Sequence, residues 1–209
     1  MVFKLEFTVG REKANKLKGV HIGIPYIEKE EISGVQAGLF NESEIFYGIQ
    51  IGGINRCECG YGVQVGVLQG TITGDKKDLE FTGVQVGIIN ANIDSFSGLQ
   101  AGAINLNGNA KGAQIGIYNY NEDNFKGVQV GAVNHQDNNS KLDGVQVGIY
   151  CSADKGNYFQ IGLITRRKDE HGFIKGWSPF VGWNTEKQKE TQKATRDEKE
   201  SALEETVKQ

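Results

Sequence analysis

Hydrophobic and polar residues alternate along most of this chain, and the alternation recurs in register with glycine. If a glycine is numbered position 0, the repeated unit reads G-V-Q-V-G-I-x-N, as in residues 83–90. The units start at Gly19, Gly34, Gly48, Gly62, Gly83, Gly98, Gly112, Gly127, Gly144 and, in degraded form, Tyr158. Ten tandem copies at intervals of 14 to 21 residues identify a repeat protein.

Each copy alternates with a period of 2, which is typical of a β-strand and predicts an all-β fold. Positions +1, +3 and +5 are aliphatic, as in Val84, Val86 and Ile88. The opposite side carries glycine at positions 0 and +4 and glutamine at +2. The nine glutamines are Gln36, Gln50, Gln64, Gln85, Gln100, Gln114, Gln129, Gln146 and Gln160, and His21 takes their place in the first copy.

The glutamine row is the candidate binding site of this sequence. A soluble two-layer sheet usually presents charged residues on its wet face, whereas these strands present only glycine and glutamine there. We interpret the nine glutamines as a hydrogen-bonding ladder that also offers a speculative binding surface. No catalytic and no metal-binding residues are predicted.

Two ways of connecting the strands fit the repeat length. In an antiparallel meander, Gln64 faces Gln85 and the hairpin turns at Gly74-Asp75. In a two-faced β-solenoid each repeat forms one coil, which needs a second strand with inward apolar residues near +8 to +11. Those positions read Glu42-Ser43-Glu44 and Asn121-Glu122-Asp123, which are turn residues. The sequence therefore favours the meander, with the solenoid as the alternative.

Residues 2–9 and 172–183 also read as strands, so the total is about twelve, which suits a closed barrel. In an outer-membrane barrel, valine and isoleucine face lipid and glutamine lines the lumen. In a soluble closed sheet, valine and isoleucine form a buried core and glutamine lies outside. In either case we expect aspartate at Val86, Val130 or Val147 to disrupt the fold more than aspartate at Gln85, Gln129 or Gln146.

The two ends of the chain differ from the repeats. Residues 184–209 contain no glycine, proline or aromatic residue and are rich in both signs of charge. They predict a charged helical or disordered tail after a β-repeat domain spanning residues 1–183. Residues 1–10 lack the apolar run of an export signal, and no stretch approaches 18 apolar residues. A cytoplasmic location follows if Met1 is the native start.

Composition excludes several classes of function. The formal net charge of −3 offers no basic face for nucleic acid. No nucleophile elbow, zinc-protease helix or phosphate loop is present. Cys57-Glu58-Cys59 is a lone C-x-C motif, because a zinc site needs further ligands. We therefore expect no enzymatic activity and no cofactor.

Residues 83–90 (G-V-Q-V-G-I-I-N) and 98–105 (G-L-Q-A-G-A-I-N) resemble the tandem G-L-Q-I-G-L-I-N units of a bacterial surface-repeat family that includes spirochaete surface proteins. The aromatic segment from Trp177 to Trp183 is similar to the family's final segment. The resemblance implies a cell-surface or outer-membrane location and a non-enzymatic structural or interaction role with an unknown protein or envelope partner. The alternative is a soluble binding scaffold that uses its Gln/Gly face and loops, with the tail as a docking helix.

Overall fold

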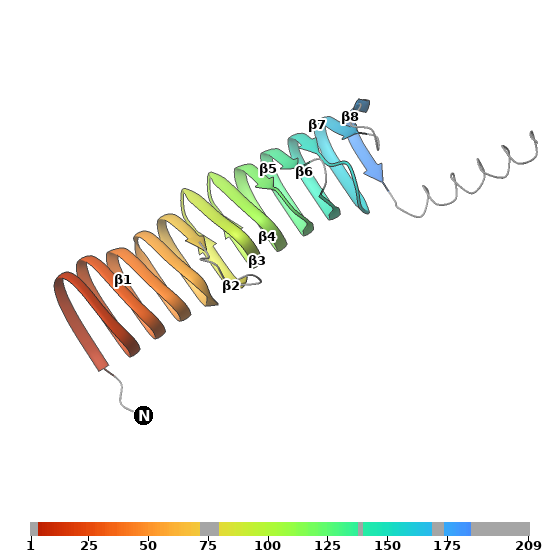
Figure 1. Cartoon of the computed structure of the whole chain (residues 1–209). Coiled ribbons are helices and arrows are strands. Elements are labelled where there is room, and N and C mark those ends of the chain that lie inside the picture. Colours follow the sequence, from red (N-terminus) through yellow and green to blue (C-terminus); the bar gives the residue numbers. More distant parts are fainter. Residues whose placement is uncertain (1–3, 72–79, 138–139, 169–173, 185–209) are drawn as a thin grey trace, which may run out of the picture.

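The computed structural model describes residues 4–71, 80–137, 140–168 and 174–184, and every regular element within these ranges is a β-strand. The strands are β1 (Lys4–Thr71), β2 (Glu80–Val86), β3 (Ile89–Ala101), β4 (Ile104–Asn121), β5 (Phe125–Gln136), β6 (Leu142–Ser152), β7 (Tyr158–Lys168) and β8 (Ile174–Asn184). They follow one another in chain order through a single sheet. The 68-residue β1 winds continuously through the first coils (Figure 1).

The chain winds into a parallel β-solenoid of about nine turns (Figure 1). From β1 to β7, successive coils pair in parallel with like positions of the repeat side by side, so that Gln64 pairs with Gln85 and Gln85 with Gln100. The predicted antiparallel meander and the closed barrel are therefore wrong, and the alternative, the solenoid, is the fold. The segment that suggested a hairpin, residues 72–79, lies outside the described residues.

Residues outside the palindrome G-V-Q-V-G determine that the strands are parallel. With glutamines opposed, the palindrome matches itself in either strand direction. An antiparallel pair would then set position +7 against −3 and position −2 against +6. Only the parallel stack places Asn105 beside Asn119 and Phe81 beside Phe96. Like residues therefore stack in the glutamine column and along most of the asparagine column, where each amide bonds to an amide of the neighbouring coil.

The interior of the solenoid is largely polar. A solenoid therefore does not need the inward apolar residues near +8 to +11 that were expected of it. Position +9 points inward and carries small polar or amide residues, such as Ser43, Thr71, Asn92, Asn107 and Asn121, all buried. These side chains bond to the glutamines across the interior: Asn107 Nδ2 donates to Gln100 Oε1 at 2.8 Å, and Gln100 Nε2 donates to Asn107 Oδ1 at 2.9 Å. Two amides thus satisfy each other without water.

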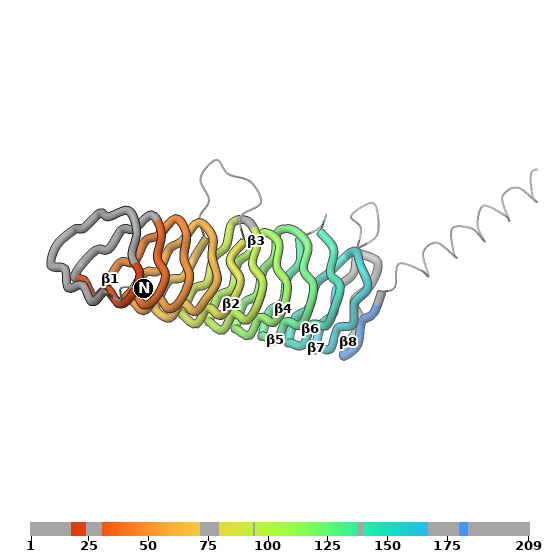
Figure 2. Tube along the Cα trace, turned by 90° about the horizontal axis from the view of Figure 1, so that it is seen from below, coloured from red at the N-terminus to blue at the C-terminus, as the bar shows by residue number. Residues whose placement is uncertain are grey.

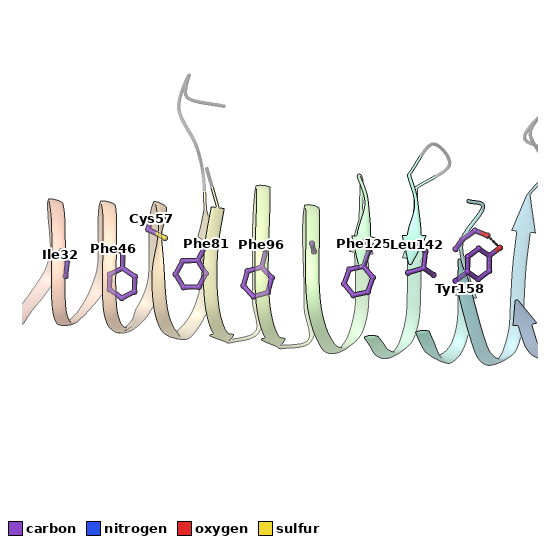
Figure 3. Close-up of a cluster of buried hydrophobic side chains, with 10 residues drawn as sticks. Ile32, Phe46, Cys57, Phe81, Phe96, Phe125, Leu142 and Tyr158 are labelled. Carbon is purple, nitrogen blue, oxygen red and sulfur yellow. Dashed lines mark hydrogen bonds between the residues drawn. The ribbon is translucent and has the colours of Figure 1, made fainter. Parts of the chain in front are cut away.

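Cys57 and Ala153, at position +9, belong to the apolar core, but most of this core is a column at position −2 (Figure 3). Its members are Ile32, Phe46, Phe81, Phe96, Ala110, Phe125 and Leu142, all nearly or fully buried. Gly60 occupies this position between Phe46 and Phe81, and the two rings stack across its coil with centroids 6.4 Å apart. Tyr158 fills the corresponding space near Gly156, and its hydroxyl donates to the Ala153 carbonyl at 2.9 Å.

Glycine at position 0 is required by the tightness of the coil. Gly127 has a φ of 142°, and a Cβ built on it would lie 1.9 Å from the carbonyl oxygen of Gly112. No side chain fits at that distance, and L-residues rarely adopt such a φ. Glycine at this position therefore lets neighbouring coils approach more closely than a side chain would allow.

The C-terminal end of the stack differs from the rest. β8 pairs antiparallel with β7, with Phe159 opposite Trp183, and both lie at the far end of the tube in Figure 2. The expected strand near residues 172–183 is present from Ile174 to Asn184. The predicted tail beyond it, residues 185–209, lies outside the described residues.

Candidate functional site

The nine predicted glutamines form one continuous ladder inside the solenoid. Each Nε2 donates to the Oε1 of the glutamine one coil earlier, from Gln50→Gln36 to Gln160→Gln146, at 2.7 to 3.1 Å. All nine side chains are at most 1% exposed. The ladder predicted from the sequence is present, but its amide groups face one another and not a partner outside.

A second amide ladder, at position +7, runs in the opposite direction. Asn90 Nδ2 donates forward to Asn105 Oδ1, Asn105 to Asn119, and Asn119 to Asn134, each at 2.7 Å. The glutamine ladder donates toward the N-terminal coils and the asparagine ladder toward the C-terminal coils. Their aligned amide dipoles oppose each other, so neither end of the rod accumulates charge of one sign from the two ladders together.

Burial of these amides decides which side of each strand can meet a partner. The alternative function, a scaffold binding through its Gln/Gly face, has no access to that face because the coil encloses it. The expectation that aspartate is better tolerated at glutamine than at valine positions is also reversed, since Val86 and Val130 are each 41% exposed.

The outward side of the same strands is a regular aliphatic surface. Positions +1, +3 and +5 from the coil of Gly48 to the coil of Tyr158 form three columns, which we call the aliphatic face. Its members include Val86, Ile88, Leu99, Ile115, Ile117 and Val130, which are 36% to 65% exposed. Contiguous apolar surface of this kind on a folded chain marks an interaction site.

The period-2 pattern predicted these columns on one side of the strands, but as a lipid-facing or a buried surface. The available signal was position −1, on the same side of the strand, which carries Tyr47, Tyr61, Lys111, Lys126 and Asp143. These side chains are all exposed. Lysine and aspartate immediately beside the aliphatic columns indicate that this side of the strand meets water at its edge.

The cysteines and histidines form no catalytic or metal-binding cluster in the described part of the chain. Cys57 is fully buried, and burial, together with the neighbouring Cys59, raises the pKa of its thiol far above the usual range. Burial also raises the pKa of Cys151. The ring of His135 stacks on that of Tyr120 with centroids 5.6 Å apart, and His171 lies outside the described residues.

No described helix is long and apolar enough to cross a membrane. The Arg166 guanidinium, in the basic segment Arg166-Arg167-Lys168, donates to the Tyr150 hydroxyl at 3.5 Å. Neither finding adds a second candidate site to the aliphatic face.

The fold defines this chain as a parallel β-solenoid with an amide-laddered interior. A scan against protein-family models found no match, and searches of the curated proteins and of the solved structures found none either. The resemblance to the surface-repeat family therefore stays a prediction from the repeated motif.

Proposed function

We propose that this chain is a non-enzymatic interaction protein of the cell envelope whose aliphatic face is its contact surface. The exposure of that face carries the proposal. A core residue such as Phe81 is 0% exposed, whereas Ile117 on the face is 65% exposed and Ile149 is 55% exposed. Leaving aliphatic side chains in water on coil after coil gains no stability for a single chain, so the surface serves a partner.

The envelope location is supported by the repeated unit itself. Residues 83–90 and 98–105 resemble the tandem units of bacterial surface proteins. A rigid interior suits a structural role, because the two amide ladders hold the outward columns at the regular spacing of parallel strands, about 4.8 Å. A surface built this way changes little when a partner binds, so little ordering entropy opposes binding.

Fractionation of the producing cells tests the proposal. We expect the wild-type chain in the envelope fraction and the variant Ile115→Lys/Val130→Lys mostly outside it, because two charges on the face oppose apolar contact. Ile93→Lys is the matched control, since Ile93 is 62% exposed but lies outside the three columns. It should fractionate like the wild type. Recovery of the wild type in the cytosolic fraction, or equal behaviour of all three proteins, would contradict the proposal.

A further inference from the structure

The relief of the aliphatic face is self-complementary about its centre. The two central coils start at Gly98 and Gly112, and in each of the three columns one coil has alanine where the other has a large aliphatic residue. The three pairs are Leu99 and Ala113, Ala101 and Ile115, and Ala103 and Ile117. When a second copy faces this surface with its coils in the reverse order, each of these large side chains lies opposite an alanine of the other copy.

We propose that a second copy of this chain docks on the aliphatic face, related by a two-fold axis that is parallel to the strands and passes between these two coils. The inference rests on the proposed function, because it names the partner of the same surface. The rotation keeps each column opposite its own kind and reverses the order of the coils. Leu99 of one copy then faces Ala113 of the other, and Ile117 faces Ala103.

Farther from the axis, the +1 and +3 columns set large residues against large ones, and the alternation of large and small residues continues in the +5 column. The coil of Gly83 meets the coil of Gly127 of the second copy, which places Val86 opposite Val130 and Ile88 opposite Ala132. At the ends of the face, Gly53 lies opposite Leu163. In the +5 column a large residue therefore meets a small one in three of the four pairs of coils, which favours close packing between the two sheets. Val67 opposite Ile149 is the exception.

Charge at the edge of the face supports the same register. In the −1 column, Lys111 faces Ser97 of the second copy, Lys126 faces Thr82, and Asp143 faces Tyr61. No lysine meets a lysine. Each of these pairs joins a charged side chain to a hydroxyl group, which can form a hydrogen bond at the rim.

The neighbouring registers are worse for a physical reason in each case. If the two-fold axis passes through the coil of Gly112, Lys111 lies opposite Lys111 and Ile117 lies opposite Ile117. If the axis passes through the coil of Gly98, Ala101 lies opposite Ala101 and Ile88 lies opposite Ile117. A two-fold axis along the rod, centred on the four columns from −1 to +5, would instead press Lys111 onto Ile117, which strips water from an unpaired charge.

The area of the face is sufficient for a stable dimer. Eight coils at about 4.8 Å each give the length of the face. Its width is the four residue intervals from +1 to +5, at about 3.3 Å each, with a side chain at either edge, so the area is roughly 800 Å² per copy. That is about the area each partner buries in a specific protein–protein interface of standard size.

Light scattering after size-exclusion chromatography of the full chain tests the inference. We expect the wild type at twice the mass of one chain. Val86→Lys should raise the dimer dissociation constant by about 100-fold or more, because it buries an unpaired charge twice in a two-fold dimer. Val86→Lys/Val130→Glu should restore the dimer, since the lysine of one copy then faces the glutamate of the other. Val86→Lys/Val130→Lys is the matched control and should stay monomeric.

Residues 86 and 130 lie three coils apart in one chain, so rescue cannot arise within a monomer. A monomeric wild type overturns the inference, as does a dimer that Val86→Lys leaves intact. Failure of rescue by Val86→Lys/Val130→Glu overturns the register. If the wild type is monomeric but its envelope association still depends on Ile115 and Val130, the partner is not a second copy of the chain. The proposed function then stands.

Discussion

Gln85 Nε2 donates to Gln64 Oε1 at 2.8 Å across 21 residues of chain, and the two residues are direct partners in a parallel ladder. Elsewhere the same bond spans 14 residues, as from Gln114 to Gln100 at 3.1 Å. The stack is therefore indifferent to the length of chain between two strands. Extra residues are accommodated between strands, while the interior columns keep their register.

Adjacent residues on opposite sides of one strand should respond very differently to a charge. Gln129 is buried and bonds to Gln114 and Gln146, each at 2.7 Å. Gln129→Asp places a carboxylate against amide oxygens without a cation, and we expect it to destabilise the fold by roughly 3 kcal/mol or more. Val130→Asp, at a position 41% exposed, should cost less than about 1 kcal/mol.

Urea unfolding followed by circular dichroism measures both effects, at a protein concentration low enough to compare single chains. Gln129→Asn serves as a second variant, because it keeps the amide but shortens its reach. A larger loss of stability for Val130→Asp than for Gln129→Asp would mean that the aliphatic side is the core.

The aromatic column should respond to truncation as a packed core does. Phe81 stacks on Phe46 at 6.4 Å and on Phe96 at 6.2 Å. Phe81→Ala removes both contacts and leaves a cavity beside Gly60, so we expect a loss of about 3–5 kcal/mol in the free energy of unfolding. Phe40→Ala, at an exposed phenylalanine, should cost under about 1 kcal/mol. Similar thermal melting temperatures for the two variants would show that the column does not carry stability.

Glycine at position 0 of the repeat should be much harder to replace than glycine on the aliphatic face. Gly127→Ala combines an unfavourable φ with a Cβ 1.9 Å from a carbonyl oxygen, and we expect a loss of about 3 kcal/mol or failure to fold. Gly53 has no positive φ, and the nearest atoms to its added Cβ are the Leu39 Cδ1 and carbonyl oxygen at 3.0 Å. Gly53→Ala should be clearly milder. Equal yields and melting temperatures would argue against the close approach of the two coils at Gly127.

Buried Cys57 should make stability fall at alkaline pH. Desolvation, with the charges of Cys59 and Glu58, raises the pKa of its thiol when folded, although Gln64 Nε2 donates to its sulfur at 3.4 Å. In the unfolded chain this thiol ionises near pH 8.5. Above that pH only the unfolded state releases the proton, so stability falls as pH rises, by up to about 1.4 kcal/mol per pH unit.

Chemical denaturation between pH 7.5 and 10 measures this slope. The variant Cys57→Ala should lose the contribution of that one thiol and show a shallower fall than the wild type. Cys151 is present in both proteins and cancels in the comparison. Parallel stability curves for the two proteins would show that Cys57 ionises as readily in the folded chain as in the unfolded one.

The sequence alone determined the repeat, its strand character and the grouping of residues into columns. Period-2 alternation assigned Gln129 to one side of its strand and Val130 to the other, and the ten-fold recurrence predicted that glutamines would meet glutamines. These are local properties, because the direction of a side chain from a strand depends only on its neighbours along the chain.

Tertiary structure decided the strand direction and which side lies inside. The palindrome around Gln85 matches itself either way, so only the distant columns of Asn105 and Phe96 select the parallel stack. Hydrophobicity predicted a valine core, because a single buried amide is costly. In the solenoid each amide instead lies one strand spacing from the same amide of the next coil. The hydrogen bonds that offset the cost of its burial form only when the coils are stacked. The aliphatic side of the strands therefore faces outward.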